Sequence, residues 1–313
     1  MIRYYEYNQY RLRCDLFILK HKGRLRYLRS IFDTFTIVKR KRPKFLFVQN
    51  PSLLLACFAV CVLKPLFNAP VIVDRHSNFF LCSKTNRITL LELIFRFLSF
   101  ISIRFANITI VTNNDLAHAI RISGGHPFVL TDKIPCLERG NGPAKKINGR
   151  TILLISSFGK DEPIESVWKA ALQLNDVEFF VSGNSAKISR ELRDSVPDNI
   201  TLTGFLSDEM FVNLLFSVDA IMVLSDAEYT LLCGCYEAVA AEKPLLTSNK
   251  KVLRELFDGA VFVDNNSYSI TTGVKIIFND LERYARTSKR TKEIISSAWE
   301  KQFIELNKQL DMI

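Results

Sequence analysis

The sequence has 313 residues, of which 48% are hydrophobic and 24% charged, and its formal net charge is +10. This length predicts about two domains, and the apolar content is enough to build large cores. No run reaches the roughly 18 apolar residues of a membrane-spanning helix. Residues 1–13 are polar and aromatic, so the sequence predicts neither a transmembrane segment nor a secretory signal.

The charge is distributed unevenly along the chain. Residues 1–140 hold 22 Lys/Arg against 8 Asp/Glu, a net of +14, whereas residues 141–313 hold 20 against 24, a net of −4. A basic half beside an acidic half indicates an anionic partner, such as nucleic acid, a phosphorylated substrate or the inner face of a membrane. A solvated basic surface without a partner is the alternative.

Seven cysteines show no paired framework, which predicts reduced thiols and a cytoplasmic protein. Cys233 and Cys235 are one residue apart, but no second Cys/His pair lies nearby in the sequence. We therefore interpret them as small core thiols, and we expect no metal and no cofactor.

In the first half, short apolar segments alternate with stretches of helix length. Strands are expected over residues 15–20, 45–50, 70–77 and 108–113. This alternation predicts a parallel sheet, whose ligands bind beyond the carboxyl ends of the strands. The polar side chains expected at that edge are those of Gln49, Asn50, Asp74, His76, Asn113 and Asn114.

Two helical segments and the chain start complete the first half. Residues 53–63 predict a short buried helix. The segment "LLELIFRFLSFISIRF", residues 90–105, is aromatic-rich and is interrupted by Arg96 and Arg104. It predicts either a buried inter-domain helix or a helix that lies on a membrane surface. No apolar strand with a glycine-bearing turn opens the chain, so the first strand is expected to be short or missing.

A polar segment with three glycines and a proline, residues 138–149, is the expected linker. A second alternating series follows it, with one helix opened by Pro163 and another capped by Ser207. We predict two doubly wound domains, residues 1–140 and 150–285, and a closing helix over 286–313. The strands expected in the second domain are 151–157, 177–184, 199–204, 220–225, 244–248 and 260–264.

The stretch "LLCGCYEAVAAEKPLLTS", residues 231–248, combines a helix start with a glycine and a carboxylate. The helix is expected to begin near Thr230 or Leu231, so its first backbone N–H groups can bind an anion. Gly234 would let a phosphate approach the backbone. Glu237 lies one turn deeper, where it can accept hydrogen bonds from a diol such as ribose. An idle carboxylate among small apolar residues would be costly, although a stray exposed Glu is the alternative.

The segment "YEAVAAEKPLLTS" resembles the donor-site signature of nucleotide-sugar glycosyltransferases of the GT-B fold, in particular the GT4-like group. That signature has Glu, seven residues, Glu-Ala, small residues, Gly, Lys/Arg-Pro and a strand. The segments "VEFFVSGN", "NITLTGFLSDEMFVNLLFSVDAIMVLSD" and "ILLISSFGKDEPIESVWKAA" agree with the same family. The resemblance covers residues 150–265 well and 40–135 loosely. It implies two Rossmann-like domains that face a cleft, with the acceptor domain first and the donor domain second.

The resemblance also implies roles for particular residues. The catalytic candidates are His76, Asp74 and Glu228. The donor-binding candidates are Glu237, Gly234, Cys233, Leu232, Thr230, Lys160 and Gly204.

The chain departs from the signature at three points. The first Glu of the signature falls on Tyr229, so Glu228 is one residue displaced, and Asp226 is a weaker substitute. Glu242 stands where the signature has Gly. The basic pair for the diphosphate is open, with Lys160 as one candidate. The other candidates are Lys250, Lys251 and Arg254.

The expected function is transfer of a sugar from a nucleoside-diphosphate sugar to an acceptor hydroxyl, in cell-surface polysaccharide or glycolipid synthesis. The expected partners are this donor, a glycan or lipid-linked acceptor and an anionic membrane surface. Nucleic acid is not expected, because no recognition motif accompanies the basic half. A two-domain nucleotide-sugar epimerase and a basic nucleic-acid-binding protein remain the alternatives.

Overall fold

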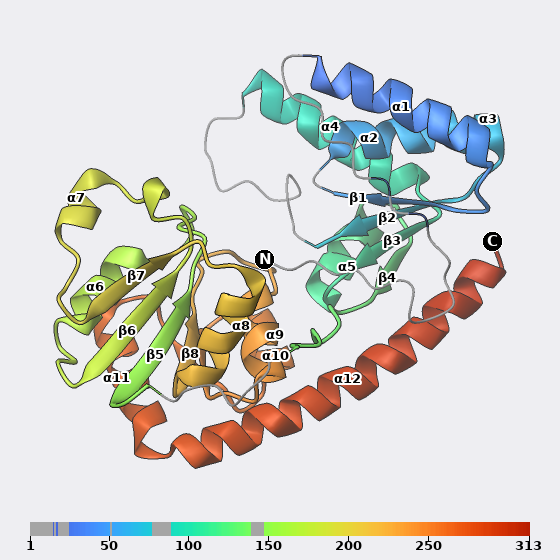
Figure 1. The fold of residues 1–313 in the computed structure, drawn as a ribbon. Coiled ribbons are helices and arrows are strands. Elements are labelled where there is room, and N and C mark those ends of the chain that lie inside the picture. The colour runs from blue at the N-terminus through green and yellow to red at the C-terminus, as the bar shows by residue number, and fades with distance from the viewer. Residues whose placement is uncertain (1–14, 16, 18–24, 51, 77–88, 139–146) are drawn as a thin grey trace. The chain divides into compact units, whose positions relative to one another are not determined.

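The computed structural model describes residues 15, 17, 25–50, 52–76, 89–138 and 147–313. The chain forms two compact units (Figure 1). Unit 1 spans Asp132–Glu300, and unit 2 combines the described residues up to Thr131 with Lys301–Ile313. The last helix, α12 (Leu281–Asp311), therefore contributes residues to both units. Among the described residues, no helix combines the length and the apolar character needed to cross a bilayer.

Unit 2 is built on a four-stranded parallel sheet in the order β1-β2-β3-β4. Its strands are β1 (Leu46–Gln49), β2 (Val71–Arg75), β3 (Ile108–Val111) and β4 (Pro127–Val129). Its helices are α1 (Arg26–Lys41), α2 (Leu53–Phe58), η2 (Ala59–Leu63), α3 (Lys64–Phe67), α4 (Leu90–Phe105) and α5 (Asn114–Ile122).

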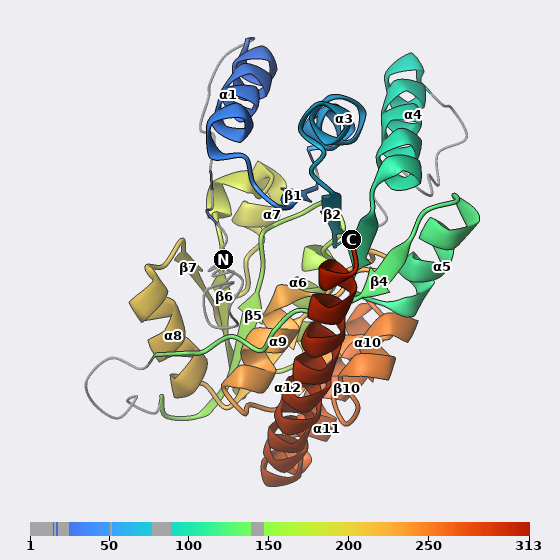
Figure 2. The same ribbon diagram turned by 90° about the vertical axis from the view of Figure 1, so that its right-hand side faces the viewer.

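The two faces of this sheet have different covers. Val71 and Val73 of β2 point into a core with α1, α2, η2 and α4, while Ile72 points to the opposite face. There it meets Leu306 and Leu310 from the end of α12. Strands buried on both faces need apolar residues at successive positions, and β2 is buried at all five positions. The helical segment α2–α3 lies on one side of it and the end of α12 on the other (Figure 2).

Unit 1 holds a six-stranded parallel sheet in the order β10-β9-β8-β5-β6-β7. Its strands are β5 (Arg150–Ile155), β6 (Val177–Ser182), β7 (Ile200–Gly204), β8 (Ala220–Val223), β9 (Leu245–Ser248) and β10 (Val261–Val263). Its helices before α12 are α6 (Ile164–Ala171), η3 (Ser185–Lys187), α7 (Arg190–Asp194), α8 (Asp208–Ser217), α9 (Cys233–Ala240), α10 (Lys251–Leu256) and α11 (Ser267–Asn279).

Helices cover both faces of this sheet. Ile152 and Leu154 of β5 pack against α6 and α11, whereas Leu153 packs against α8, α9 and α10 (Figure 1). The strand order reverses between β5 and β8. From β5 the chain adds β6 and β7 on one side of the sheet, and then β8, β9 and β10 on the other. Both units therefore have the parallel α/β character that the sequence predicts, and the reversal of strand order that defines double winding is seen in unit 1.

Most of the expected elements are present, and the strand ends that differ are mostly shortened by one or two residues. Ser207 caps α8 as predicted, because its hydroxyl accepts a hydrogen bond from the amide of Met210 at 3.3 Å. Strand β4 and helix α11 were not predicted. The strand expected over 15–20 and the linker segment 139–146 lie outside the described residues.

The start of α9 differs from the prediction. The helix begins at Cys233, not at Thr230 or Leu231. Tyr229 has a positive φ of 62°, and Leu232 is extended, so the chain reaches helical geometry only after both. Pattern alone does not reveal such a left-handed position.

Candidate active site

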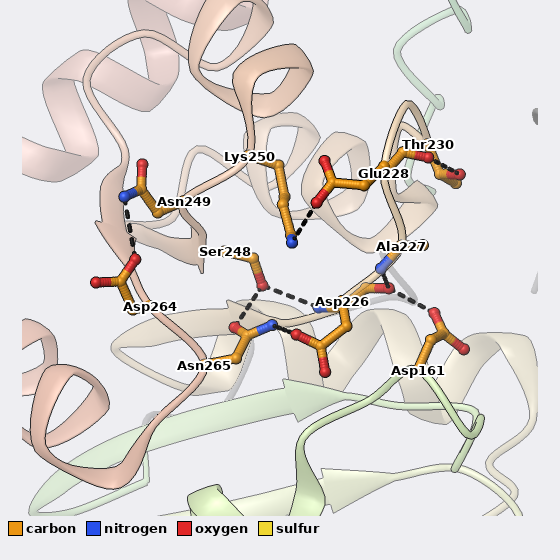
Figure 3. A network of polar contacts seen from close by, with 11 residues as sticks. Asp161, Asp226, Ala227, Glu228, Thr230, Ser248, Asn249, Lys250, Asp264 and Asn265 are labelled. Carbon is orange, nitrogen blue, oxygen red and sulfur yellow. Dashed lines mark hydrogen bonds and ion pairs between the residues drawn. The ribbon is translucent and has the colours of Figure 1, made fainter. Parts of the chain in front are cut away.

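Polar side chains at the carboxyl edge of the unit 1 sheet form one connected network (Figure 3). The Ser225 hydroxyl donates to Asp161 at 2.5 Å, and the Ser225 amide donates to the Ser248 hydroxyl at 2.9 Å. Ser248 in turn donates to Asn265 at 2.7 Å, and the Asn265 amide donates to Asp226 at 2.8 Å. These bonds join the last residue of β9 to the segments that follow β5, β8 and β10, so they hold the loops of this edge together.

The loop between β8 and α9 carries the displaced acid of the signature. Glu228 forms an ion pair with Lys250, with 2.9 Å between Oε1 and Nζ. Thr230 donates to the Glu228 carbonyl oxygen at 3.3 Å. The structure thus brings two candidates together, because the residue expected to contact the sugar and one of the residues expected to bind the diphosphate form an ion pair.

The first turn of α9 has a distinct arrangement. Leu232 precedes the helix and provides no side-chain cap, so the first-turn amides have no capping partner of that kind. Gly234 is buried against the sheet, and a Cβ there would lie 3.0 Å from both methyl groups of Val223. Helix-to-sheet packing is therefore sufficient to require glycine, and donor contact by its backbone stays a prediction.

Glu237 lies one helical turn beyond Cys233, on a helix whose other residues are mostly buried. Burial raises the pKa of its carboxyl from 4.5 to about 7. Among the described residues, none gives this carboxylate a side-chain hydrogen bond or an ion pair. A partly buried acid that lacks such partners has a desolvation cost that a ligand with hydrogen-bond donors would offset.

The loop after β5 is held by hydrogen bonds to the carboxylate of Glu162, which belongs to the same loop. Glu162 accepts hydrogen bonds from the hydroxyl and amide of Ser157, the amide of Phe158 and the hydroxyl of Ser156. Phe158 has a positive φ of 53° within this turn. Lys160 lies exposed at the same loop, next to Asp161 of the network.

Gly204 ends β7 with a positive φ of 69° and has open space where a Cβ would lie. Two strands, β5 and β6, separate β7 from β8. At about 4.8 Å per strand, Gly204 is roughly 14 Å along the edge from the start of α9. The structure places it at the same edge, on the far side from Glu237.

The end of α9 explains a departure from the signature. Glu242 has a positive φ of 55°, a conformation that glycine adopts more easily. Its carboxylate pairs with Lys292 at 2.9 Å. The Lys243 ammonium donates to the carbonyls of Phe216 and Val218 at 2.9 and 2.6 Å. Lys243 therefore fastens the end of α8, and Glu242 occupies a turn position suited to glycine.

Three further residues considered in the sequence, Cys235, Lys251 and Arg254, have contacts within unit 1 that account for them. Cys235 is buried beside the Thr247 hydroxyl at 3.4 Å, and burial raises its pKa to about 12, so it is an unreactive core thiol. Lys251 pairs with Glu255 at 3.8 Å, and Arg254 donates to Asn249 at 2.7 Å.

In unit 2, Asp74 and His76 form a pair at the end of β2. His76 Nε2 donates to the carboxylate of Asp74, 2.8 Å from Oδ1 and 2.9 Å from Oδ2. Asp74 is 6% exposed, so its charge is largely removed from water. A carboxylate in this position fixes the ring orientation and stabilises its protonated form.

Two asparagines lie at the same edge of unit 2. The Asn50 amide N–H donates to the Asp74 carbonyl oxygen at 2.9 Å, while both polar atoms of its side chain are buried with no described partner. Asn113 caps α5 by accepting from the Leu116 amide at 2.9 Å. Asn113 is thus structural, whereas Asn50 has hydrogen-bonding capacity available.

The network residues Asp161, Ser248 and Asn265 were not among the predicted site residues. Each follows the apolar run of a strand in the sequence, as Asn50 and Asp74 do. That positional signal could have found them, but their mutual bonds depend on strand order.

No protein-family model matches this chain, and no curated protein matches it. Solved structures do. HepE from Anabaena, in complex with UDP and glucose, aligns with a TM-score of 0.74 and 14% identity over 96% of this chain and 86% of that chain.

The fold is GT-B. Sucrose-phosphate synthase from Thermosynechococcus elongatus matches with a TM-score of 0.73 and 16% identity, over 94% of this chain and 80% of the other. A glycosyltransferase from Rickettsia africae ESF-5 gives 0.69 and 13% identity over 94% and 84%. These neighbours have two Rossmann-like domains, and the GT-B fold of this chain agrees with the sequence prediction.

Proposed function

We propose that this protein is a GT4-like glycosyltransferase that moves a hexosyl group from a nucleoside-diphosphate sugar to an acceptor hydroxyl. The observation that carries the proposal is Glu237 in a GT-B fold. It is a partly buried carboxyl whose pKa burial raises to about 7, one turn inside a helix that follows a parallel strand. A ribose diol would supply hydrogen-bond donors, which no side chain among the described residues gives this group.

The donor would lie along the carboxyl edge of the unit 1 sheet. The first-turn amides of α9, at Cys233 and Gly234, would face the diphosphate, where the helix dipole favours negative charge. Lys250 would add a cation, and Glu228, its ion-pair partner, would orient it or contact the sugar. HepE, a neighbour by fold, was solved with UDP-glucose, which supports this donor class.

The reaction would break the bond from the sugar C1 to the diphosphate oxygen and form a bond from C1 to the acceptor oxygen. The diphosphate leaves with the electron pair, and the charge that develops on it is stabilised by the amides and the cation. The acceptor proton would pass to His76, which the Asp74 carboxylate orients and stabilises once charged. Asn50 would bond the acceptor through its side-chain amide.

The acceptor would be a glycan or a lipid-linked glycan of cell-surface polysaccharide or glycolipid synthesis. The enzyme would work in the cytoplasm, peripherally on the inner face of the membrane, without metal or cofactor. The net charge of +14 on residues 1–140 supports an anionic surface as a partner.

The test is a thermal-shift panel of UDP-, GDP- and dTDP-sugars on the full chain, followed by titration calorimetry of any hit. We expect one nucleotide to raise the melting temperature. Glu237→Ala should weaken its affinity by about tenfold to a hundredfold, the effect of leaving ribose hydroxyls unpaired.

Glu178→Ala is the matched control, because Glu178 is an exposed carboxylate on β6 of the same unit. It should bind the donor as wild type does. Absence of affinity for all nucleotides, or equal loss in both variants, would contradict the proposed donor site. Salt-sensitive DNA binding without nucleotide affinity would instead support a nucleic-acid-binding protein.

A further inference from the structure

Helix α4 of unit 2 exposes a continuous apolar stripe. At helical spacing of three and four residues, the side chains on one face are those of Leu90, Leu93, Ile94, Phe97 and Phe100. All five are exposed, Phe97 to 61%. The opposite face carries Ser99, Ser102 and Ile103, which are buried. One face of this helix thus packs in unit 2. The apolar stripe on the other face is not covered by any of the described residues.

Helix α1 lies on the same face of the unit 2 sheet, with α2 between α1 and α4 (Figures 1 and 2). Its exposed side mixes large apolar and basic residues at helical spacing. Leu28 and Phe32 share that side with Arg29, Lys39 and Arg40. Phe32 is 70% exposed. Apolar and basic residues on one helix face are typical of helices that lie in a membrane interface.

The charges of the two helices favour an anionic occupant. Together α1 and α4 carry seven Lys/Arg against two acids, Asp33 and Glu92. Glu92 is turned into an ion pair with Arg96 at 3.2 Å, and its side chain is only 16% exposed. Arg104 continues the α4 stripe at its end, where a long basic side chain can reach lipid headgroups.

We propose that unit 2 binds anionic lipid bilayers through the α4 stripe and the basic-apolar side of α1, which we call the α1/α4 surface. The α4 stripe enters the interface, and the basic residues of α1 contact the headgroups. With 16 residues, α4 is about 24 Å long, too short to span a bilayer but sufficient to lie along one. The α1/α4 surface specifies how the chain would reach the membrane location that the proposed function includes. Lipid binding by this surface does not depend on glycosyl transfer.

The experiment measures sedimentation of the full chain with phosphatidylcholine vesicles, with and without phosphatidylglycerol. We expect binding to the anionic vesicles only, weakened by salt. Leu93→Asp should lower the partition coefficient at least about tenfold, since it removes one inserted side chain and adds a charge. Leu172→Asp is the matched control, because Leu93 is 57% and Leu172 is 63% exposed, the latter in unit 1.

A second variant and its control test the electrostatic contribution to vesicle binding. Lys39→Gln with Arg40→Gln should reduce binding about thirtyfold, at roughly 1 kcal/mol per basic residue. Lys289→Gln with Arg290→Gln, the same adjacent residue types exposed on α12, should not change it. Phe97→Trp should show a blue-shifted emission with anionic vesicles.

Three results would overturn the proposal. They are equal binding to neutral and anionic vesicles, equal effects of each variant and its control, and conversion of a dimer to a monomer by Leu93→Asp. The last would assign the surface to a second copy of the chain. Nucleotide affinity, measured without vesicles, should survive in Leu93→Asp, so failure here is distinct from failure of the donor site.

Discussion

The carboxyl edges of the two sheets hold their polar groups in different ways. In unit 1, Ser225, Ser248, Asp161 and Asn265 bond to one another across the segments of four strands. In unit 2, the Asp74–His76 pair stands beside Asn50, whose side-chain atoms are buried with no described partner. The unit 1 network is internally hydrogen-bonded, which leaves Glu237 as a carboxylate of that unit without a described side-chain partner, whereas the unit 2 edge keeps the side-chain amide of Asn50 for a ligand.

This difference has a physical meaning for a transferase. A donor that binds backbone amides and one carboxylate gains from loops that are already fixed, because less ordering free energy is lost on binding. An acceptor hydroxyl must instead meet a group that can change its protonation state. The comparison predicts that changes in unit 2 affect turnover, while changes in unit 1 affect stability and donor affinity.

The largest effect is expected at His76. His76→Ala should lower the rate of nucleotide release from the donor by about 10² to 10³, because general-base catalysis contributes in this range. Asp74→Asn should cost less, since it leaves the imidazole in place but removes the charge that stabilises its protonated form. The measurement is steady-state kinetics with the donor identified by the thermal-shift panel.

Stability provides the control for this prediction. Both tryptophans, Trp168 and Trp299, lie in unit 1, so intrinsic fluorescence reports its unfolding. That transition should be unchanged in His76→Ala. A variant with full turnover would show that the Asp74–His76 pair is structural, and His118→Ala on α5 should retain full activity.

The next effect concerns two glycines of the unit 1 edge. Gly183 has a φ of 124°, and a Cβ there would overlap the Ser156 carbonyl oxygen. Gly183→Ala should therefore lower the free energy of unfolding of unit 1 by about 3 kcal/mol, from backbone strain and the clash.

Gly204→Ala is the matched change. Gly204 has a φ of 69°, but no atom lies within 4 Å of the position that a Cβ would take, so the substitution should cost only about 1 kcal/mol. Urea unfolding followed by tryptophan fluorescence measures both. Equal costs would show that close packing between Gly183 and Ser156 contributes nothing.

The fold was largely predictable from the sequence, because its strands are short apolar runs and stretches of helix length separate one run from the next. Val71, Ile72 and Val73 illustrate this, since burial on both faces requires apolar residues at consecutive positions. β4 was missed because three residues that begin with a proline carry little strand signal.

The candidate site was predictable only in part. Glu237 could be found because a carboxylate among alanines conflicts with burial, and Asp74 and His76 because they follow a strand. The pairing of Glu228 with Lys250 could not, because the residues are 22 positions apart and meet only through β8 and β9. The left-handed turn at Tyr229, which delays α9, is likewise invisible to apolar periodicity.

A smaller effect follows from the pKa of Glu237. The folded pKa is about 7 against 4.5 for the free group, so the folded state holds more protons between these values. Wild-type stability should then fall as pH rises from 4.5 to 7, by at most about 3 kcal/mol. Glu237→Gln should remove this dependence and gain about 2 kcal/mol over wild type at pH 8, with little difference at pH 4.5.

Urea unfolding of the two proteins at several pH values measures this difference. Glu178→Gln, at an exposed position of β6, should follow the wild-type curve. Parallel curves for Glu237→Gln and wild type would show that Glu237 is hydrated or paired in solution. The donor site would then lose its main support.

The smallest effects are expected at the Glu228–Lys250 ion pair, where single substitutions distinguish the roles of the two residues. Lys250→Met should weaken binding of the nucleoside diphosphate about tenfold, because it removes a charge-assisted contact. Glu228→Gln should strengthen that binding by about twofold to threefold, since it leaves the Lys250 charge uncompensated and removes a negative charge near the phosphates. Titration calorimetry with the nucleotide alone measures both. Shifts of the same sign would mean that the pair acts only by holding the β8–α9 loop, whereas opposite signs assign the phosphate contact to Lys250 and leave Glu228 to the sugar.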